Sequence, residues 1–165
     1  CQVRVGGRLT GWAQQHAHAT CLPIWGRSYE PPALATRESA EIIEFLLELK
    51  PPSRAVTQAI QAALAWLASV RIEGWRLVSR QAAPIVYKYQ LGTTDPALVK
   101  DPESPPLWAR YYDPVTRKPV FASREGILLG RYEDLSRERR TGYEWFGSWP
   151  EALLKDRTPV RPVRP

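Results

Sequence analysis

The clearest candidate for an anion-binding site in this sequence is the segment 107–124, which carries two arginines on what reads as a short hairpin. Asp113-Pro114 starts a turn and Lys118-Pro119 ends it, because proline fixes its own φ and favours extended backbone in the residue before it. Arg110 and Arg124 then lie on the two arms. A guanidinium is a rigid fork of donors that matches a carboxylate or phosphate. The segment fits either an anion site or a solvated turn with chance arginines.

A third arginine lies in the segment 26–32, Gly-Arg-Ser-Tyr-Glu-Pro-Pro, directly before a predicted helix. The plain interpretation of Arg27 is an ion pair with Glu30 or Glu38. Other chemistries lack their residues: His16 and His18 are the only histidines, so no three-histidine zinc site is available. The sequence also has no glycine-rich phosphate loop with its lysine and no nucleophile elbow.

Length and charge are consistent with one globular domain that is attracted to polyanions. The chain has 165 residues, 44% of them hydrophobic, with seven tryptophans and a net charge of +6. The charge does not distinguish nucleic acid from acidic polysaccharide. No apolar run approaches the roughly 20 residues that span a bilayer, and the start of the chain does not resemble a signal peptide. Residues 157–165 are rich in Pro and Arg, and we expect an extended tail there.

The chain contains no methionine and begins with Cys1, which favours a truncated or processed chain. Cys1 can pair with Cys21 if their backbones approach closely. Two cysteines without further pattern do not identify a redox compartment.

Hydrophobic periodicity predicts mainly helices. A helix capped by Thr36 extends to about Leu49, and a second, capped by Ser53, carries an apolar stripe to Leu67. Two helices joined by a short Pro turn indicate an antiparallel pair. Further helices are predicted at 9–17, 132–143 and 150–155, and β-type composition within a loop-rich middle at 75–78 and 85–89.

Five segments in order, 9–16, 27–30, 38–39, 106–112 and 139–147, resemble the C-terminal half of the catalytic domain of pectate lyases of polysaccharide lyase family ten. This resemblance assigns residues 1–156 to that portion. It implies an all-α dominated fold, part of an incomplete α/α toroid of paired antiparallel helices, with long loops and a short β-hairpin. Two features depart from the family pattern: Glu125 replaces an expected aspartate, and 71–105 matches weakly.

The same resemblance implies calcium-assisted β-elimination of α-1,4-polygalacturonate. Motif matching assigns Arg27 as the base and Arg110 and Arg124 as binders of substrate carboxylates. The calcium-binding aspartates of the family lie upstream of the matched region, so no metal ligand is assigned within these residues. The resemblance further implies a secreted or periplasmic, bacterial-type parent that acts as a monomer on pectin.

One expectation follows from this assignment, and two alternatives to it remain. We expect the 165 residues alone to be unstable or inactive, because half of the toroid would be missing. One alternative is a noncatalytic carbohydrate-binding module that uses its tryptophans as stacking platforms. The other is a nucleic-acid-binding protein, although its signature motifs are absent.

Overall fold

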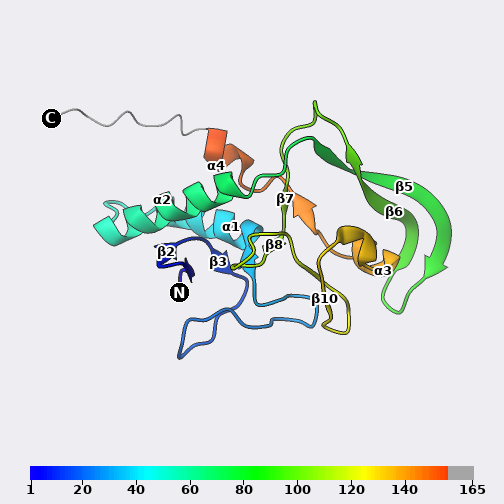
Figure 1. Cartoon of the computed structure of the whole chain (residues 1–165), viewed down its shortest axis with the longest axis horizontal. Coiled ribbons are helices and arrows are strands. Elements are labelled where there is room, and N and C mark those ends of the chain that lie inside the picture. Colours follow the sequence, from blue (N-terminus) through cyan, green and yellow to red (C-terminus); the bar gives the residue numbers. More distant parts are fainter. Residues whose placement is uncertain (156–165) are drawn as a thin grey trace.

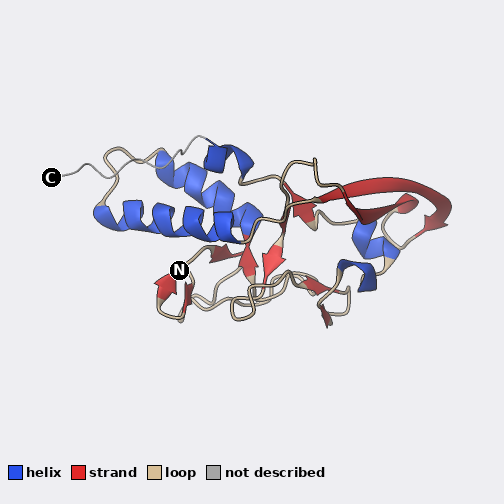
Figure 2. Cartoon of the chain, turned by 45° about the horizontal axis from the view of Figure 1, so that its top comes forward, coloured by secondary structure: helices blue, strands red, loops and turns tan. Residues whose placement is uncertain are grey.

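The computed structural model describes residues 1–155, and two adjacent helices form one end of the molecule (Figures 1 and 2). Helix α1 spans Thr36–Leu47 and α2 spans Arg54–Ser69. The predicted pair is therefore confirmed. The Ser53 hydroxyl accepts a hydrogen bond from the backbone N–H of Val56 at 3.3 Å, which confirms the predicted cap of α2.

The predicted cap of α1 is wrong by one residue, because Ala35 holds that position and Thr36 is already helical. Thr36 is fully buried, and its hydroxyl donates to the carbonyl oxygen of Ala109 at 2.7 Å. Its side chain therefore attaches the start of α1 to a distant segment of the chain.

The apolar stripe predicted for α2 is buried. Ile60, Ala63 and Leu67 on α2 pack in the same core as Ile43 of α1. Trp66, beside the stripe, is also buried and packs edge-on against Tyr112. The helix pair thus covers the short strands that hold residues 107–124.

A three-stranded antiparallel sheet lies at the centre. Strand β4 (Leu34–Ala35) pairs on one side with β3 (Trp12–Ala13) and on the other with β8 (Tyr111–Tyr112). In register, Leu34 lies opposite Tyr112 and Ala35 opposite Tyr111. Because β4 leads directly into α1, this sheet fixes the start of that helix beside Arg110.

Three two-stranded sheets surround the central one. Strand β1 (Arg4–Val5) pairs with β2 (Arg8–Leu9), β7 (Trp108–Ala109) with β11 (Phe146–Gly147), and β9 (Phe121–Ala122) with β10 (Leu128–Leu129).

The longest strands form a hairpin at the opposite end from the helix pair (Figures 1 and 2). It consists of β5 (Trp75–Val86) and β6 (Leu91–Lys100), with a register shift between Gln81 and Ile85. The prediction of a loop-rich middle is therefore wrong for this region. Most residues of β5 are exposed, so its sequence lacks the alternation that one buried face would impose.

The expected all-α toroid is wrong, because strands and loops predominate over helices within residues 1–155. The remaining helices are short: η1 (Tyr132–Asp134), α3 (Arg137–Thr141) and α4 (Glu151–Lys155). Leu135 has extended backbone and divides the helix expected at 132–143. Helix α4 confirms the one expected near 150–155. The predicted tail at 157–165 lies outside the described residues.

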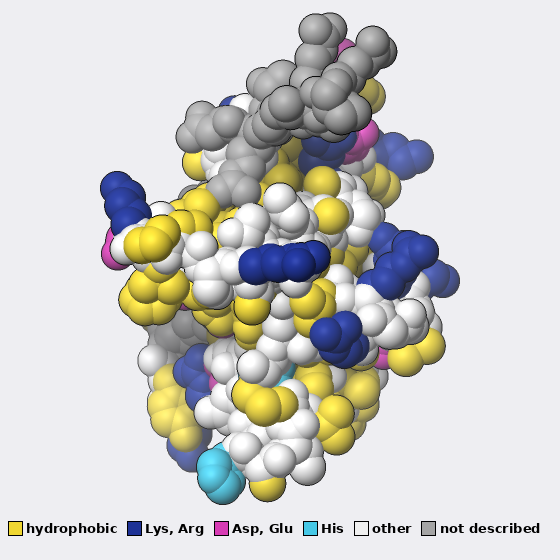
Figure 3. Space-filling model, turned by 90° about the vertical axis from the view of Figure 1, so that its left-hand side faces the viewer, with side chains coloured by type: hydrophobic (Ala, Val, Ile, Leu, Met, Phe, Trp, Pro, Cys, Tyr) yellow, Lys and Arg dark blue, Asp and Glu magenta, His cyan; other side chains and the backbone are white. Residues whose placement is uncertain are grey.

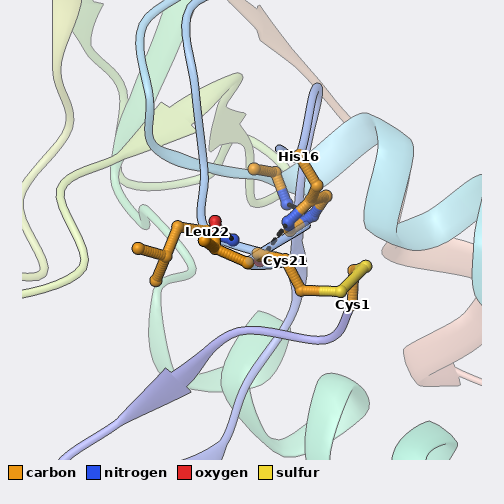
Figure 4. Close-up of a disulfide and its surroundings, with 6 residues drawn as sticks. Cys1, His16, Cys21 and Leu22 are labelled. Atoms are coloured by element: carbon orange, nitrogen blue, oxygen red, sulfur yellow. Dashed lines mark hydrogen bonds between the residues drawn. A yellow bond between two sulfur atoms is a disulfide. The ribbon is translucent and has the colours of Figure 1, made fainter. Parts of the chain in front are cut away.

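The helix predicted at 9–17 is also wrong, since this segment forms the end of β2, strand β3 and a loop. A disulfide between Cys1 and Cys21 closes the loop (Figure 4). His16 accepts a hydrogen bond from the backbone N–H of Ala13 through Nε2, and its Nδ1 lies 2.9 Å from the carbonyl oxygen of Cys21. His16 therefore has a structural role in this loop.

Within residues 1–155, no helix has the length and apolar character needed to cross a membrane. Figure 3 shows the end with the helix pair, where basic and apolar side chains are interspersed and acidic ones are few. The basic side chains on this face do not gather into one continuous groove.

Gly11 allows strand β3 to approach the helix pair. A Cβ atom at position 11 would lie 2.5 Å from both the Trp66 ring and the Ser39 hydroxyl. We therefore expect Gly11→Ala to lower the free energy of unfolding by about 1–3 kcal/mol, measured by denaturant titration. Gly130→Ala is the matched control, because a Cβ there meets nothing within 4 Å. Equal stability of the two variants would contradict this account.

Candidate active site

An open pocket of about 550 Å³ brings two of the three predicted arginines together. Arg27 comes from the loop before β4, and Arg110 from the residue between β7 and β8. Gln90 and Tyr143 also line this pocket. The full lining is Arg27, Arg37, Glu38, Glu41, Gln90, Arg110, Thr141, Gly142, Tyr143 and Glu144.

Arg27 forms an ion pair with Glu30, which confirms the plain interpretation of its sequence position. The guanidinium donates through Nε at 2.9 Å and also through Nη2 to the same carboxylate oxygen, Oε1. The backbone N–H of Arg27 donates to Oε2 at 2.8 Å. A Cβ atom at Gly26 would lie 2.6 Å from Oε2, so the glycine leaves room for the carboxylate. The short turn 27–30 therefore sets the direction of Arg27 locally.

This pair strongly favours the charged forms of both groups. The hydrogen bond to Glu30 raises the pKa of Arg27 above its ordinary value, although burial opposes it. Burial would raise the pKa of Glu30, but the hydrogen bonds from Arg27 outweigh it and lower that pKa to about 2. The Arg27 side chain remains 61% exposed, whereas that of Glu30 is 4% exposed. The Arg27 guanidinium is therefore a cation that is accessible from the pocket, while the buried Glu30 carboxylate holds its orientation.

Arg110 is the most buried of the three predicted arginines. It pairs with Glu38 of α1, and their side chains are 10% and 17% exposed. Burial opposes the charge of Arg110, but the Glu38 carboxylate outweighs it and raises the pKa of Arg110. Within residues 1–155, the Nε of Arg110 and the Oε2 of Glu38 are buried without a hydrogen-bond partner. The Arg110–Glu38 pair thus leaves one donor and one acceptor without a partner inside the described part of the fold.

Arg124 does not line this pocket, and it lies in the turn between β9 and β10, not on an arm of the predicted hairpin. It pairs with Glu138 of α3 through Nε and Nη2. The hydrogen bond to Glu138 raises the pKa of Arg124 and lowers that of Glu138. The Ser28 hydroxyl donates to the carbonyl oxygen of Arg124, which joins the turn 27–30 to this segment. The predicted turn is also confirmed: the Asp113 N–H donates to the Lys118 carbonyl oxygen at 3.0 Å.

Two tyrosines connect the three arginines. The guanidinium carbons of Arg27 and Arg124 lie 4.7 Å and 5.9 Å from the ring centroid of Tyr29. Those of Arg27 and Arg110 lie 5.9 Å and 5.1 Å from that of Tyr143. The two rings meet edge-on at 5.2 Å. The arginines therefore share one aromatic support.

Tyr143 is also the centre of a hydrogen-bonded group. Its hydroxyl lies 2.6 Å from that of Tyr111, 3.4 Å from Oε1 of Gln14 and 3.3 Å from Oε1 of Glu30. Burial raises the pKa of Tyr143 to about 12, although Tyr111 and Arg110 act against this. Tyr143 is therefore a neutral phenol at pH 7.

Sequence reasoning singled out the three arginines and offered Glu30 or Glu38 as the ion-pair partner of Arg27. Glu30 is confirmed, whereas Glu38 pairs with Arg110 instead. The same reasoning missed Tyr29, Tyr143 and Gln90 as parts of the site. The two tyrosines lie inside the segments that carried the family resemblance, so that resemblance was an available signal. Gln90 lies at a hairpin tip and carried no signal.

The described residues do not supply a complete calcium site. Within 1–155, no group of three or more His, Cys, Asp or Glu side chains is placed to hold a metal ion. The glutamates nearest the three arginines are already paired with them. The chemistry available here is anion binding by guanidinium donors, because each pair leaves N–H groups free for a ligand.

The Glu30 carboxylate should make stability depend on pH. Its pKa is about 2 in the folded protein and ordinarily 4.5, so its contribution is full above pH 4.5 and is lost as the pH falls toward 2. We expect Glu30→Gln to lower the free energy of unfolding by about 1–3 kcal/mol at pH 7, and the difference from wild type to shrink over that window.

The exposed Glu133 provides the control for this measurement. Glu133→Gln should change the free energy of unfolding by less than about 0.5 kcal/mol. Denaturant titrations at several pH values measure both variants. A difference between Glu30→Gln and wild type that stays constant down to pH 2 would exclude this role for Glu30.

Comparison with known proteins agrees with the motifs that the site contains. The family model of pectic acid lyase matches residues 1–154. The family 10 polysaccharide lyase from Cellvibrio cellulosa is similar in structure, with a TM-score of 0.77 and 29% sequence identity over 94% of this chain. A mutant of that enzyme in complex with trigalacturonic acid gives the same values.

The match covers 45% of each of those two structures, so this chain spans less than half of their length. A comparison with curated proteins finds no match. Because the family model extends over nearly the whole sequence, the chain belongs to the pectic acid lyase family.

Proposed function

We propose that the protein cleaves α-1,4-polygalacturonate by β-elimination, with Arg27 as the base. The observation that carries this proposal is the meeting of Arg27 and Arg110 in one open pocket, with Arg124 near the same Tyr29 ring as Arg27. The family membership and the trigalacturonic acid bound to the Cellvibrio cellulosa enzyme support the same substrate class.

In this proposal Arg110 and Arg124 bind the carboxylates of the substrate. Their N–H groups that are not used by Glu38 and Glu138 form the new hydrogen bonds. Positive charge next to the C6 carboxylate of a galacturonate stabilises negative charge that develops at C5, and therefore makes the C5 proton more acidic.

Arg27 then takes the C5 proton. The electrons of the C5–H bond form a double bond between C4 and C5, the C4–O bond breaks, and the leaving oxygen takes up a proton from solvent. The products are one chain end with an unsaturated uronide and one with a free hydroxyl group.

The pair with Glu30 opposes this role and defines what catalysis requires. Arginine is charged at neutral pH, since its ordinary pKa is above about 12, and Glu30 raises it further. Arg27 therefore has to separate from Glu30 and release one proton to solvent, so that a neutral guanidine takes the C5 proton and becomes the guanidinium again. Such a separation is feasible because the Arg27 side chain is mostly exposed, whereas Glu30 keeps its bond from the backbone.

The same observation favours a second candidate, a noncatalytic module that binds acidic polysaccharide. In that role Arg27 stays paired with Glu30 and acts only as a cation. The two candidates differ in one product, the unsaturated uronide, which only the lyase forms.

Arg27→Ala tests the base in a full-length protein that carries these residues. We expect kcat on polygalacturonate to fall about 10²- to 10⁴-fold, followed by the ultraviolet absorbance of the unsaturated uronide. Arg131→Ala is the control, because Arg131 is 72% exposed and outside the pocket. Unchanged kcat in Arg27→Ala would remove the base assignment, and binding without any product from wild type would favour the module.

Calcium is a further part of the proposal, held by carboxylates outside residues 1–155, and no step above depends on it. We expect a chelator to abolish product formation by the full-length protein and added calcium to restore it. We also expect the 165 residues alone to form no product and to bind no calcium in calorimetry. Product formed by this chain alone with calcium would contradict the proposal.

A further inference from the structure

The tip of the β5–β6 hairpin, residues 87–90, joins the site from a part of the chain that the motifs did not include. Gln90 lines the same pocket as Arg27 and Arg110. The preceding residue, Tyr89, is 67% exposed, and its ring centroid lies 5.3 Å from the guanidinium carbon of Arg124. The Nζ of Lys88 lies 5.1 Å from the same ring.

Helix α3 holds this tip in place. The Gln90 amide lies 3.3 Å from the carbonyl oxygen of Glu138, and Arg137 donates to the carbonyl oxygens of Thr94 and Gly92 at 2.9 Å and 3.2 Å. A Cβ atom at Gly142 would lie 2.7 Å from the Gln90 amide, so glycine is needed for this close approach.

A second contact lies one turn further along. Arg140 donates through Nε and Nη2 to the two carboxylate oxygens of Asp95 on β6, each at 2.9 Å. Because α3 also carries Glu138, the partner of Arg124, one helix positions both the hairpin tip and Arg124.

The chemistry at the tip is that of a carboxylated sugar site. Lys88 and Arg124 each lie within 5.3 Å of the exposed Tyr89 ring. In the part of the chain that the structure describes, no salt bridge involves Lys88. A uronate carboxylate can take hydrogen bonds from one of these cations, while the phenol contacts the sugar ring and its hydroxyls.

We propose that Lys88 and Tyr89 form an outer subsite, next to Arg124, for a further uronate residue of an acidic polysaccharide chain. This subsite rests on the proposed function, because it extends the same binding surface. It lies beyond the reacting bond, so it acts on affinity for longer chains and not on the elimination step.

The test measures affinity by calorimetry for galacturonate oligomers of increasing length, in the full-length protein. An Arg27→Ala background keeps the oligomers intact. We expect the affinity of the parent to rise with length until the outer subsite is filled. Tyr89→Ala should lower the affinity for long oligomers about tenfold and leave the affinity for the shortest oligomers unchanged. Lys88→Ala should act in the same way, with a smaller loss on methyl-esterified oligomers.

Val86→Ala is the matched control, since Val86 lies on the same hairpin and is 84% exposed. It should bind oligomers of every length as the parent does. If the parent binds no oligomer, the proposed function fails. If the parent binds, but Tyr89→Ala and Lys88→Ala match it at every length, the subsite assignment alone is wrong. A loss that is equal at all lengths would also overturn it.

Discussion

Charge compensation is the constraint on which this site depends. Four arginines gathered around two tyrosines, the three predicted ones and Arg139, would repel one another, and their burial would carry a desolvation cost. Each pairs with a glutamate: Glu30 in the turn of Arg27, Glu38 on α1 for Arg110, and Glu138 on α3 for both Arg124 and Arg139. Each carboxylate uses only part of each guanidinium that it contacts, so orientation is fixed while donors remain available. Removal of one glutamate would therefore affect the direction of an arginine as well as its charge.

The same compensation creates a conflict at Arg27. Binding of a substrate carboxylate needs a charged guanidinium, whereas removal of the C5 proton needs a neutral one. Glu30 supports the first requirement and opposes the second. Arg110 and Arg124 face no such conflict, because in the proposed reaction they remain cations throughout. The contact between Arg27 and Glu30 therefore distinguishes the two roles. A site that only binds substrate keeps this ion pair, whereas a catalytic site must break it.

The sequence allowed part of this structure to be predicted. The pair α1 and α2 followed from caps and apolar stripes, and the turn after Asp113 from its prolines, because these signals are local. The two-residue strands could not be predicted, since their pairing joins distant segments such as 34–35 and 111–112. The hairpin β5–β6 was missed because its exposed faces leave no alternation. The candidate arginines could be proposed from residue type and motif, whereas their pairing with Glu38 and Glu138 depends on contacts between residues 72 and 14 positions apart.

The ion pairs of the site also affect how a polymer would first meet the protein. Since each site arginine has an anionic partner, the site itself adds little to the net charge of +6. Long-range attraction of a polyanion must then come mainly from arginines and lysines elsewhere on the surface, and salt screens such attraction. The site acts at short range, through the directions of its donors. Added salt should therefore lower the rate of association with a polyanion. The chemical groups that the site recognises should stay the same.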